Sequence, residues 1–275
     1  MRIDAHQHFW TLARGDYGWM SPALGPIYRD FTPDDLAPLL AEAGIDRSIL
    51  VQAADTVAET EFMLSLADQA DWIAGVVGWI DTEAPDAIAT LERLARHPKF
   101  KGIRPMIQEI PDDDWVLRDD LDPVFDALGA MGLRFDALVL PRHLPRLLRR
   151  LDRHPDLKCV IDHGAKPALA SGELTEWRAD MTRLAEETPA FCKLSGLVTE
   201  IGPDWTIDQL RPASDLILQA FGAERVMFGS DWPVLNLASD YQTWVGTADA
   251  LVSDLTEAAR ASVWGHTAAR FYGVA

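Results

Sequence analysis

The sequence of 275 residues has little cysteine, few basic residues and no long apolar run. Its two cysteines, Cys159 and Cys192, both lie in apolar segments, so they predict no disulfide framework and favour a reducing compartment. The longest apolar run, residues 73–80, is too short to cross a bilayer, and the first residues do not follow the pattern of a signal peptide. We therefore expect a cytoplasmic protein.

Acidic residues outnumber basic ones, with 43 aspartates and glutamates against 25 lysines and arginines and a formal net charge of −18. Nucleic acids and anionic membranes are bound through basic patches, so this balance argues against both as partners. A small anionic substrate is still compatible with it, because a pocket can carry its own arginine. The composition leaves open whether the protein is a monomer or a homo-oligomer.

Short apolar or β-branched runs alternate with helical patterns along the whole chain. One helix is expected from residue 33, because Thr32 suits the N-cap, Pro33 the first turn and Gly44 the stop. Eight strands are expected at residues 2–8, 48–53, 73–80, 101–107, 133–140, 158–163, 191–197 and 225–230. Eight strands with about eight intervening helices predict an α/β fold, a single-domain (β/α)8 TIM barrel over residues 1–275, in preference to a doubly wound sheet.

The segment of residues 9–31, which follows the first expected strand, is rich in aromatic side chains. A loop that leaves the C-terminal end of a barrel strand lies over the mouth of the barrel. We expect this loop to form a lid or a pocket wall, and simple packing on the surface is the equally weighted alternative.

Polar and ionisable side chains collect at the ends of the expected strands, where barrel enzymes carry their catalytic residues. His6 and His8 share one face of the first strand, because strand side chains alternate with a period of two. Alone, this pair is weak evidence for a metal site, but His163 and Asp231 stand at the ends of two other strands. Three histidines and an aspartate suit zinc, manganese or a similar divalent ion.

We therefore expect His6, His8, His163 and Asp231 to bind one divalent metal, with zinc ahead of manganese. The ion would lower the pKa of a bound water, and Asp231 would take that water's proton. The same cluster could also activate water by general-base catalysis without a metal, and the residues do not decide between these alternatives.

Three more polar residues are expected to act near the substrate. Arg104 could polarise a carbonyl or hold an anion, although an ion pair with Asp81 or Glu109 is the alternative. Gln52 and Lys166 are expected to contact substrate hydroxyls.

Aromatic and deeper residues give weaker expectations. Trp10 and Trp232 could offer stacking faces to a sugar ring. Lys193 and Ser195 have no assigned role, and Lys193 could simply pair with an acid such as Asp4 deep in the barrel.

Seven motifs resemble, in their order, the amidohydrolase superfamily: RIDAHQHFW, LVQA, GVVGWID, KGIRPMIQ, VIDHGAKP, CKLSGLVTE and MFGSDWPV. They are most similar to its sugar-acid lactonase branch, which includes fuconolactonases, rhamnonolactonases and galactonolactonases. The resemblance implies a distorted (β/α)8 barrel that hydrolyses a small-molecule lactone, such as L-fucono-, L-rhamnono- or galactonolactone, to the hydroxy acid. It also implies the same roles for the residues: metal positions at His6, His8, His163 and Asp231, Asp231 as general base, and Gln52, Arg104 and Lys166 close to substrate.

The sequence departs from the binuclear members of that superfamily, which supply a carboxylate from the fourth strand and a histidine from the fifth. Here the fourth strand offers Arg104 and the fifth has no histidine. A cation beside the site repels a second ion, so one metal is expected at most.

Three other functions are compatible with the motifs: hydrolysis of a dicarboxylate or sulfonated muconolactone, decarboxylation, and non-catalytic sugar binding. The last is disfavoured, because ionisable residues at four strand ends would cost stability without serving packing.

Overall fold

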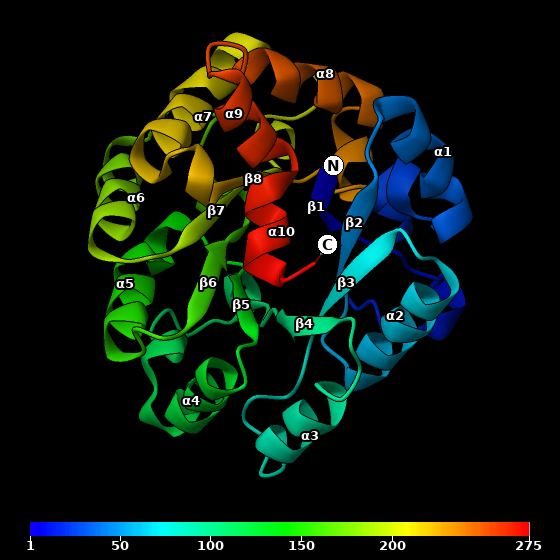
Figure 1. Ribbon diagram of the computed structural model, residues 1–275, viewed down its shortest axis with the longest axis vertical. Helices are drawn as coiled ribbons and strands as arrows, with labels where there is room; N and C mark the ends of the chain where they lie inside the picture. The colour runs from blue at the N-terminus through cyan, green and yellow to red at the C-terminus, as the bar shows by residue number, and fades with distance from the viewer. Residues whose placement is uncertain (275) are drawn as a thin grey trace.

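The computed structural model describes residues 1–274, and these form a single (β/α)8 barrel (Figure 1). Eight parallel strands pair in chain order, and a bridge between Gln7 and Trp232 joins the end of the last strand to the first. The strands are β1 (Ile3–Gln7), β2 (Arg47–Val51), β3 (Ile73–Gly78), β4 (Phe100–Ile103), β5 (Arg134–Ala137), β6 (Lys158–Ile161), β7 (Phe191–Leu194) and β8 (Val226–Phe228). The prediction of a barrel is confirmed, and the doubly wound alternative is wrong.

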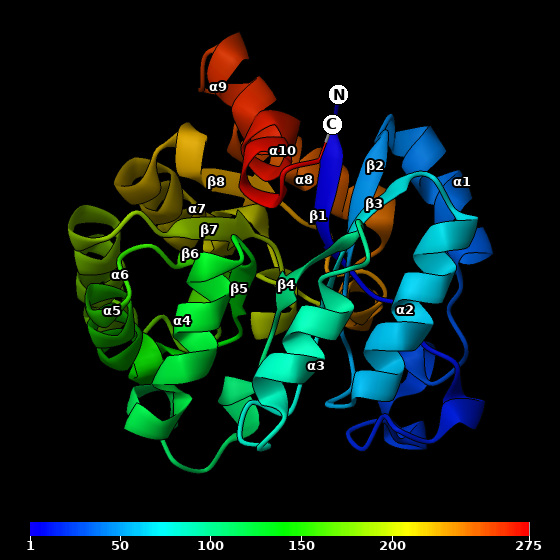
Figure 2. The same cartoon turned by 60° about the horizontal axis from the view of Figure 1, so that its bottom comes forward.

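Helices surround the strands and close one end of the barrel (Figures 1 and 2). The first helix begins as expected, because the backbone N–H of Thr32 donates to Asp35 at 2.8 Å and Gly44 ends it at a φ of 63°. The helices are α1 (Pro33–Ala43), α2 (Val57–Gln69), α3 (Ala87–Leu94), α4 (Asp122–Ala130), α5 (Leu144–Arg153), α6 (Thr175–Glu187), α7 (Ile207–Phe221), α8 (Tyr241–Leu251), α9 (Glu257–Ala261) and α10 (Thr267–Tyr272). Within residues 1–274, no helix combines the length and the apolar character that crossing a membrane would require.

The observed strands begin within one residue of the expected runs but end one to four residues before them. The polar residues that close those runs therefore lie in the turns that follow the strands. His163 and Asp231 adopt left-handed backbone conformations there, with φ of 54° and 59°. Such conformations are costly for residues other than glycine and are often found at functional sites.

The C-terminal helix α10 closes the N-terminal end of the barrel. Ala268, Phe271 and Tyr272 pack against side chains of the barrel interior that include Ile3 and Val160. Figure 2 places α10 on the side opposite to the segment of residues 9–31. The open end of the barrel is therefore the end where the strands finish, which is where barrel enzymes keep their sites.

The aromatic loop of residues 9–31 is closed at its base and fastened over β2. Trp10 and Phe31 exchange two backbone hydrogen bonds of 3.1 and 2.9 Å. Further along, the indole N–H of Trp19 donates to the backbone oxygen of Ala53 at 2.7 Å. These bonds hold Trp19 at the mouth of the barrel.

Candidate active site

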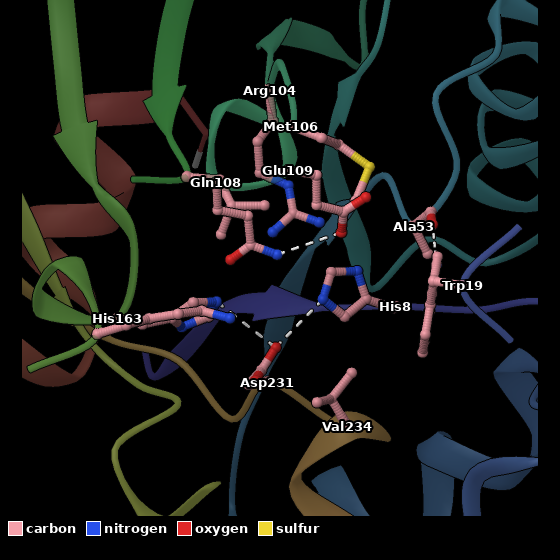
Figure 3. Close-up of a pocket in the computed structure, with 12 residues that line it drawn as sticks. His8, Trp19, Ala53, Arg104, Met106, Gln108, Glu109, His163, Asp231 and Val234 are labelled. Carbon is pink, nitrogen blue, oxygen red and sulfur yellow. Dashed lines mark hydrogen bonds and ion pairs between the residues drawn. The ribbon is translucent and has the colours of Figure 1, made fainter. Parts of the chain in front are cut away.

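A pocket opens at the C-terminal ends of the strands (Figure 3). It leaves about 180 Å³ for the centres of water-sized molecules. Its lining residues come from the segments that follow most of the strands and from the aromatic loop: His8, Trp19, Ala53, Arg104, Met106, Gln108, Glu109, Leu138, His163, Lys166, Asp231 and Val234. The structure thus brings together five of the residues singled out from the sequence, from four different strand ends.

The floor of the pocket is a cluster of three imidazoles around one carboxylate. Oδ1 of Asp231 lies 3.2 Å from Nε2 of His8, 3.6 Å from Nε2 of His6 and 3.7 Å from Nε2 of His163. A backbone hydrogen bond brings Asp231 to the histidines. The backbone N–H of Asp231 donates to the carbonyl of His6 at 2.8 Å and so joins the turn after β8 to β1.

In His8 and His163, the ring nitrogen that faces away from Asp231 has a hydrogen-bond partner. Nδ1 of His8 donates to the carbonyl of Val51 at 2.7 Å, which leaves Nε2 as the unprotonated nitrogen facing Asp231. Nδ1 of His163 lies 2.8 Å from Oγ of Ser195. Ser195, which had no assigned role, therefore orients a ring of the cluster.

Burial and charge set the protonation states of the cluster. Burial lowers the pKa of His163 to about 4 and also lowers the pKa values of His6 and His8. Burial alone would raise the pKa of Asp231, but His163 and His8 act against it and hold that pKa well below its usual value. At neutral pH the cluster is a carboxylate among neutral imidazoles, which is an arrangement able to accept a proton from water.

Beneath the cluster, Lys193 holds two buried acids and one histidine. Its Nζ lies 2.6 Å from Oδ2 of Asp136 and 3.0 Å from Oδ1 of Asp162, and it donates to Nδ1 of His6 at 3.0 Å. Burial would raise the pKa of Asp162, but the charge of Lys193 holds it well below its usual value. The expected pairing of Lys193 with Asp4 is wrong. Asp4 accepts instead from the backbone N–H of Ser230, within hydrogen-bond distance at 2.8 Å.

Gln52, which follows β2, and Arg104, which follows β4, bond to each other across the end of β3. A guanidinium nitrogen of Arg104 donates to the carbonyl of Gln52, and the amide of Gln52 donates to the carbonyl of Arg104 at 2.7 Å. Nη1 of Arg104 lies 3.5 Å from Asp162, so within residues 1–274 its acidic partner is neither Asp81 nor Glu109. Arg104 reaches the pocket, whereas Gln52 is fully buried and lies outside the lining.

The structure does not bring Trp10 and Trp232 to the pocket. Both indoles are buried, and Phe31 packs between them with its ring centroid 5.4 Å from that of Trp10 and 5.1 Å from that of Trp232. The aromatic wall is Trp19, whose ring meets Trp10 edge-on at 5.5 Å. The structure therefore does not support the expected stacking of a sugar ring on Trp10 or Trp232, because neither exposes a ring face to the pocket.

The donor set of the cluster fits one divalent ion. His6, His163 and Asp231 each offer a ligand atom within 4.8 Å of the others, and Nε2 of His8 lies 3.1 Å from Nε2 of His6. Imidazole and carboxylate are typical zinc ligands. Nδ1 of His6 faces the ammonium of Lys193 at 3.0 Å, and Nε2 faces the guanidinium of Arg104 at 3.3 Å. An ion at Nε2 would require the tautomer that carries the ring proton on Nδ1, where Oδ1 of Asp162, 3.5 Å away, can accept it.

Two cations make a second ion unfavourable at the same place. Nη1 of Arg104 lies 3.3 Å from Nε2 of His6, and Lys193 lies on the other side of that ring. Like charges this close repel strongly in a buried site.

Known proteins resemble the chain along its whole length. The amidohydrolase family model matches residues 3–274. An L-fucono-1,5-lactonase of Burkholderia ambifaria is 46% identical over 99% of this chain and 96% of its own. An L-fucono-1,5-lactonase of Burkholderia multivorans is 39% identical over 100% of this chain and 96% of its own. A crystal structure of a Burkholderia multivorans amidohydrolase with bound zinc has a TM-score of 0.93 and 40% identity over 100% of both chains. On these grounds, and with a barrel whose histidines and aspartate meet at the strand ends, the chain belongs to the amidohydrolase family.

Proposed function

We propose that the protein hydrolyses a sugar-acid lactone to the open hydroxy acid, with L-fucono-1,5-lactone and related aldono-lactones as substrates. The observation that carries the proposal is the ionised Asp231 among three neutral imidazoles on the floor of a small pocket. The likeness to two L-fucono-1,5-lactonases over nearly the whole chain supports the same reaction.

The reaction can be followed through the side chains of the pocket. Asp231 takes a proton from water while the water oxygen bonds to the lactone carbonyl. Arg104, which lines the same pocket, donates to the oxygen that gains negative charge. The bond from the former carbonyl carbon to the ring oxygen then breaks, and Asp231 returns the proton to that oxygen, which leaves as a hydroxyl. The acid product loses its own proton to solvent.

We also propose one divalent metal, zinc ahead of manganese, held by His6, His8, His163 and Asp231. When bound, such an ion lowers the pKa of water and polarises a carbonyl. The zinc in the related Burkholderia multivorans structure supports this choice. Proton transfer to Asp231 is the step that this chain provides with or without the ion.

A panel of lactones tests the proposed reaction. We expect acid release from L-fucono-, L-rhamnono- and galactonolactone, followed with a pH indicator, at rates above spontaneous hydrolysis. Each assay is repeated after chelation and after return of zinc or manganese, which measures how much of the rate depends on the ion. The absence of catalysed acid release from every sugar lactone, under all of these metal conditions, would refute the proposal.

A glycine substitution tests whether the position of His163 matters. Gly196 has a φ of 63°, and a Cβ added there would lie 2.6 Å from Nδ1 of His163. We expect Gly196→Ala to push the imidazole from its place and to reduce kcat by about a hundredfold, as misplacement by roughly 1 Å can do.

The matched control for this variant is Gly172→Ala. Gly172 has a φ of 74° and open space around its Cβ position, so the control carries the backbone strain without the collision. Circular dichroism and melting curves compare the folding of the two variants. Equal kcat for both would mean that the position of His163 is not critical.

A further inference from the structure

Glu109 and Gln108 form one wall of the pocket that the reaction described above does not use. Nε2 of Gln108 lies 3.4 Å from Oε1 of Glu109, and Figure 3 shows both side chains extending into the space above His8, with Asp231 on the far side. Both belong to the short 3-10 helix Ile107–Glu109 that follows β4.

This wall is held in place by its backbone. The N–H of Gln108 donates to the carbonyl of Leu138 after β5 at 3.1 Å, and the N–H of Glu109 donates to Met106 at 3.0 Å. The side chain of Ile107, which precedes them in the same turn, is fully buried. The carboxylate of Glu109 is therefore presented to the pocket by an anchored turn.

The chemistry of the wall is that of hydrogen-bond acceptors. Because the amide nitrogen of Gln108 is turned towards Glu109, its oxygen is left to accept, as are the carboxylate oxygens of Glu109. A hydroxyl of a substrate can donate to such a wall. An ionised carboxylate of a substrate can only accept, and it would also meet a charge of its own sign.

Each of the two cations that line the pocket, Arg104 and Lys166, has another acid nearby. Arg104 faces Asp162 beneath the floor. Burial raises the pKa of Glu200, and the charge of nearby Lys166 opposes that rise, so Lys166 has an acidic neighbour. An adjoining hollow shares Met106 and Glu109 with the pocket, and its other acids lie outside the pocket lining: Asp55, Asp81 and Glu83.

From this arrangement we infer that Glu109, supported by Gln108, selects neutral polyhydroxy lactones and rejects lactones that carry a second, ionised carboxylate. The inference rests on the proposed lactone hydrolysis and names the substrate class of that same site. Glu109 acts as a specificity-determining residue through the charge and the acceptor character of its carboxylate.

A matched pair of substrates tests this selection: galactonolactone and the corresponding galactarolactone, which differ in a terminal CH2OH or carboxylate. We expect the natural chain to prefer the neutral lactone in kcat/KM. Glu109→Gln should reduce that preference about tenfold, and Glu109→Lys should reduce it further, mainly through the KM of the charged lactone. Added salt should weaken the preference of the natural chain more than that of Glu109→Gln.

Asp55→Asn is the matched control, because Asp55 is an exposed acid that lines the adjoining hollow and not the pocket. The inference is overturned if Glu109→Gln leaves the preference unchanged, if Asp55→Asn changes it equally, or if the natural chain hydrolyses both lactones alike. Turnover of the neutral lactone in those cases would leave the proposed function intact. Failure to hydrolyse any lactone would instead refute the proposed function and this inference together.

Discussion

Replacing Asp231 with asparagine should reduce kcat for lactone hydrolysis roughly a thousandfold or more, within the range that loss of a general base can produce. The carboxylate faces Nε2 of His8 at 3.2 Å, and its lowered pKa keeps it in the ionised form that a general base requires at neutral pH. An asparagine amide has nearly the same shape but cannot take that proton. Acid release under saturating substrate measures the change.

The loss must be separated from unfolding and from a general effect of charge. Asp231→Asn should keep the circular dichroism spectrum of the natural chain, because the backbone bond from Asp231 N–H to His6 does not depend on the side chain. Asp55→Asn removes the same charge from the barrel mouth outside the pocket and should retain turnover. A folded Asp231→Asn protein with an unchanged kcat would remove Asp231 from the mechanism.

The cluster of His6, His8, His163 and Asp231 could be predicted from the sequence because it depends on the simplest geometry of the fold. Alternation along β1 places two imidazoles together, and a barrel brings the ends of its strands to one rim. The starts of the strands were also predictable, because several follow a glycine or proline that ends the preceding helical pattern, as before β5 and β7. The ends of the strands were not predictable, because residue type alone does not show that His163 and Asp231 leave the extended conformation for a left-handed one.

The pocket walls could not be predicted in the same way. The aromatic loop has no regular period, so nothing in the order of its residues distinguishes Trp19, at the pocket, from Trp10, buried behind it. That difference depends on the bridge between Trp10 and Phe31. The sequence offers Glu109 only as an alternative ion-pair partner of Arg104, whereas a 3-10 turn directs Gln108 and Glu109 into the pocket.

The acidic partners of Lys193 could not be predicted from the sequence pattern either, because they depend on which acids share the barrel interior. Asp136 from β5 and Asp162 after β6 approach Lys193 from two neighbouring strand positions, and Tyr272 of α10 donates to Asp136 at 2.7 Å. The chain therefore links its C-terminal helix to the floor of the site through buried polar groups. The ammonium of Lys193 is the group that contacts both of these acids and His6.

Lys193→Met should consequently be among the most destabilising single substitutions in the chain. It would leave Asp136 and Asp162 buried without the ammonium that lies 2.6 and 3.0 Å from them. Removing one partner of a buried ion pair costs about 3–5 kcal/mol of the free energy of unfolding. In a chain of this size we expect the melting temperature to fall by about 10 °C.

Lys101→Met is the control for this substitution. Lys101 is a half-buried lysine of β4 that forms no ion pair within residues 1–274, so the change removes an ammonium without exposing an acid to an apolar interior. The double variant Lys193→Met with Asp136→Asn should recover part of the loss, because one of the two unpaired carboxylates is then neutral and Asp162 still faces Arg104. Equal melting temperatures for Lys193→Met and Lys101→Met would show that the buried network does not support the floor of the site, and the orientation of His6 would then need another cause.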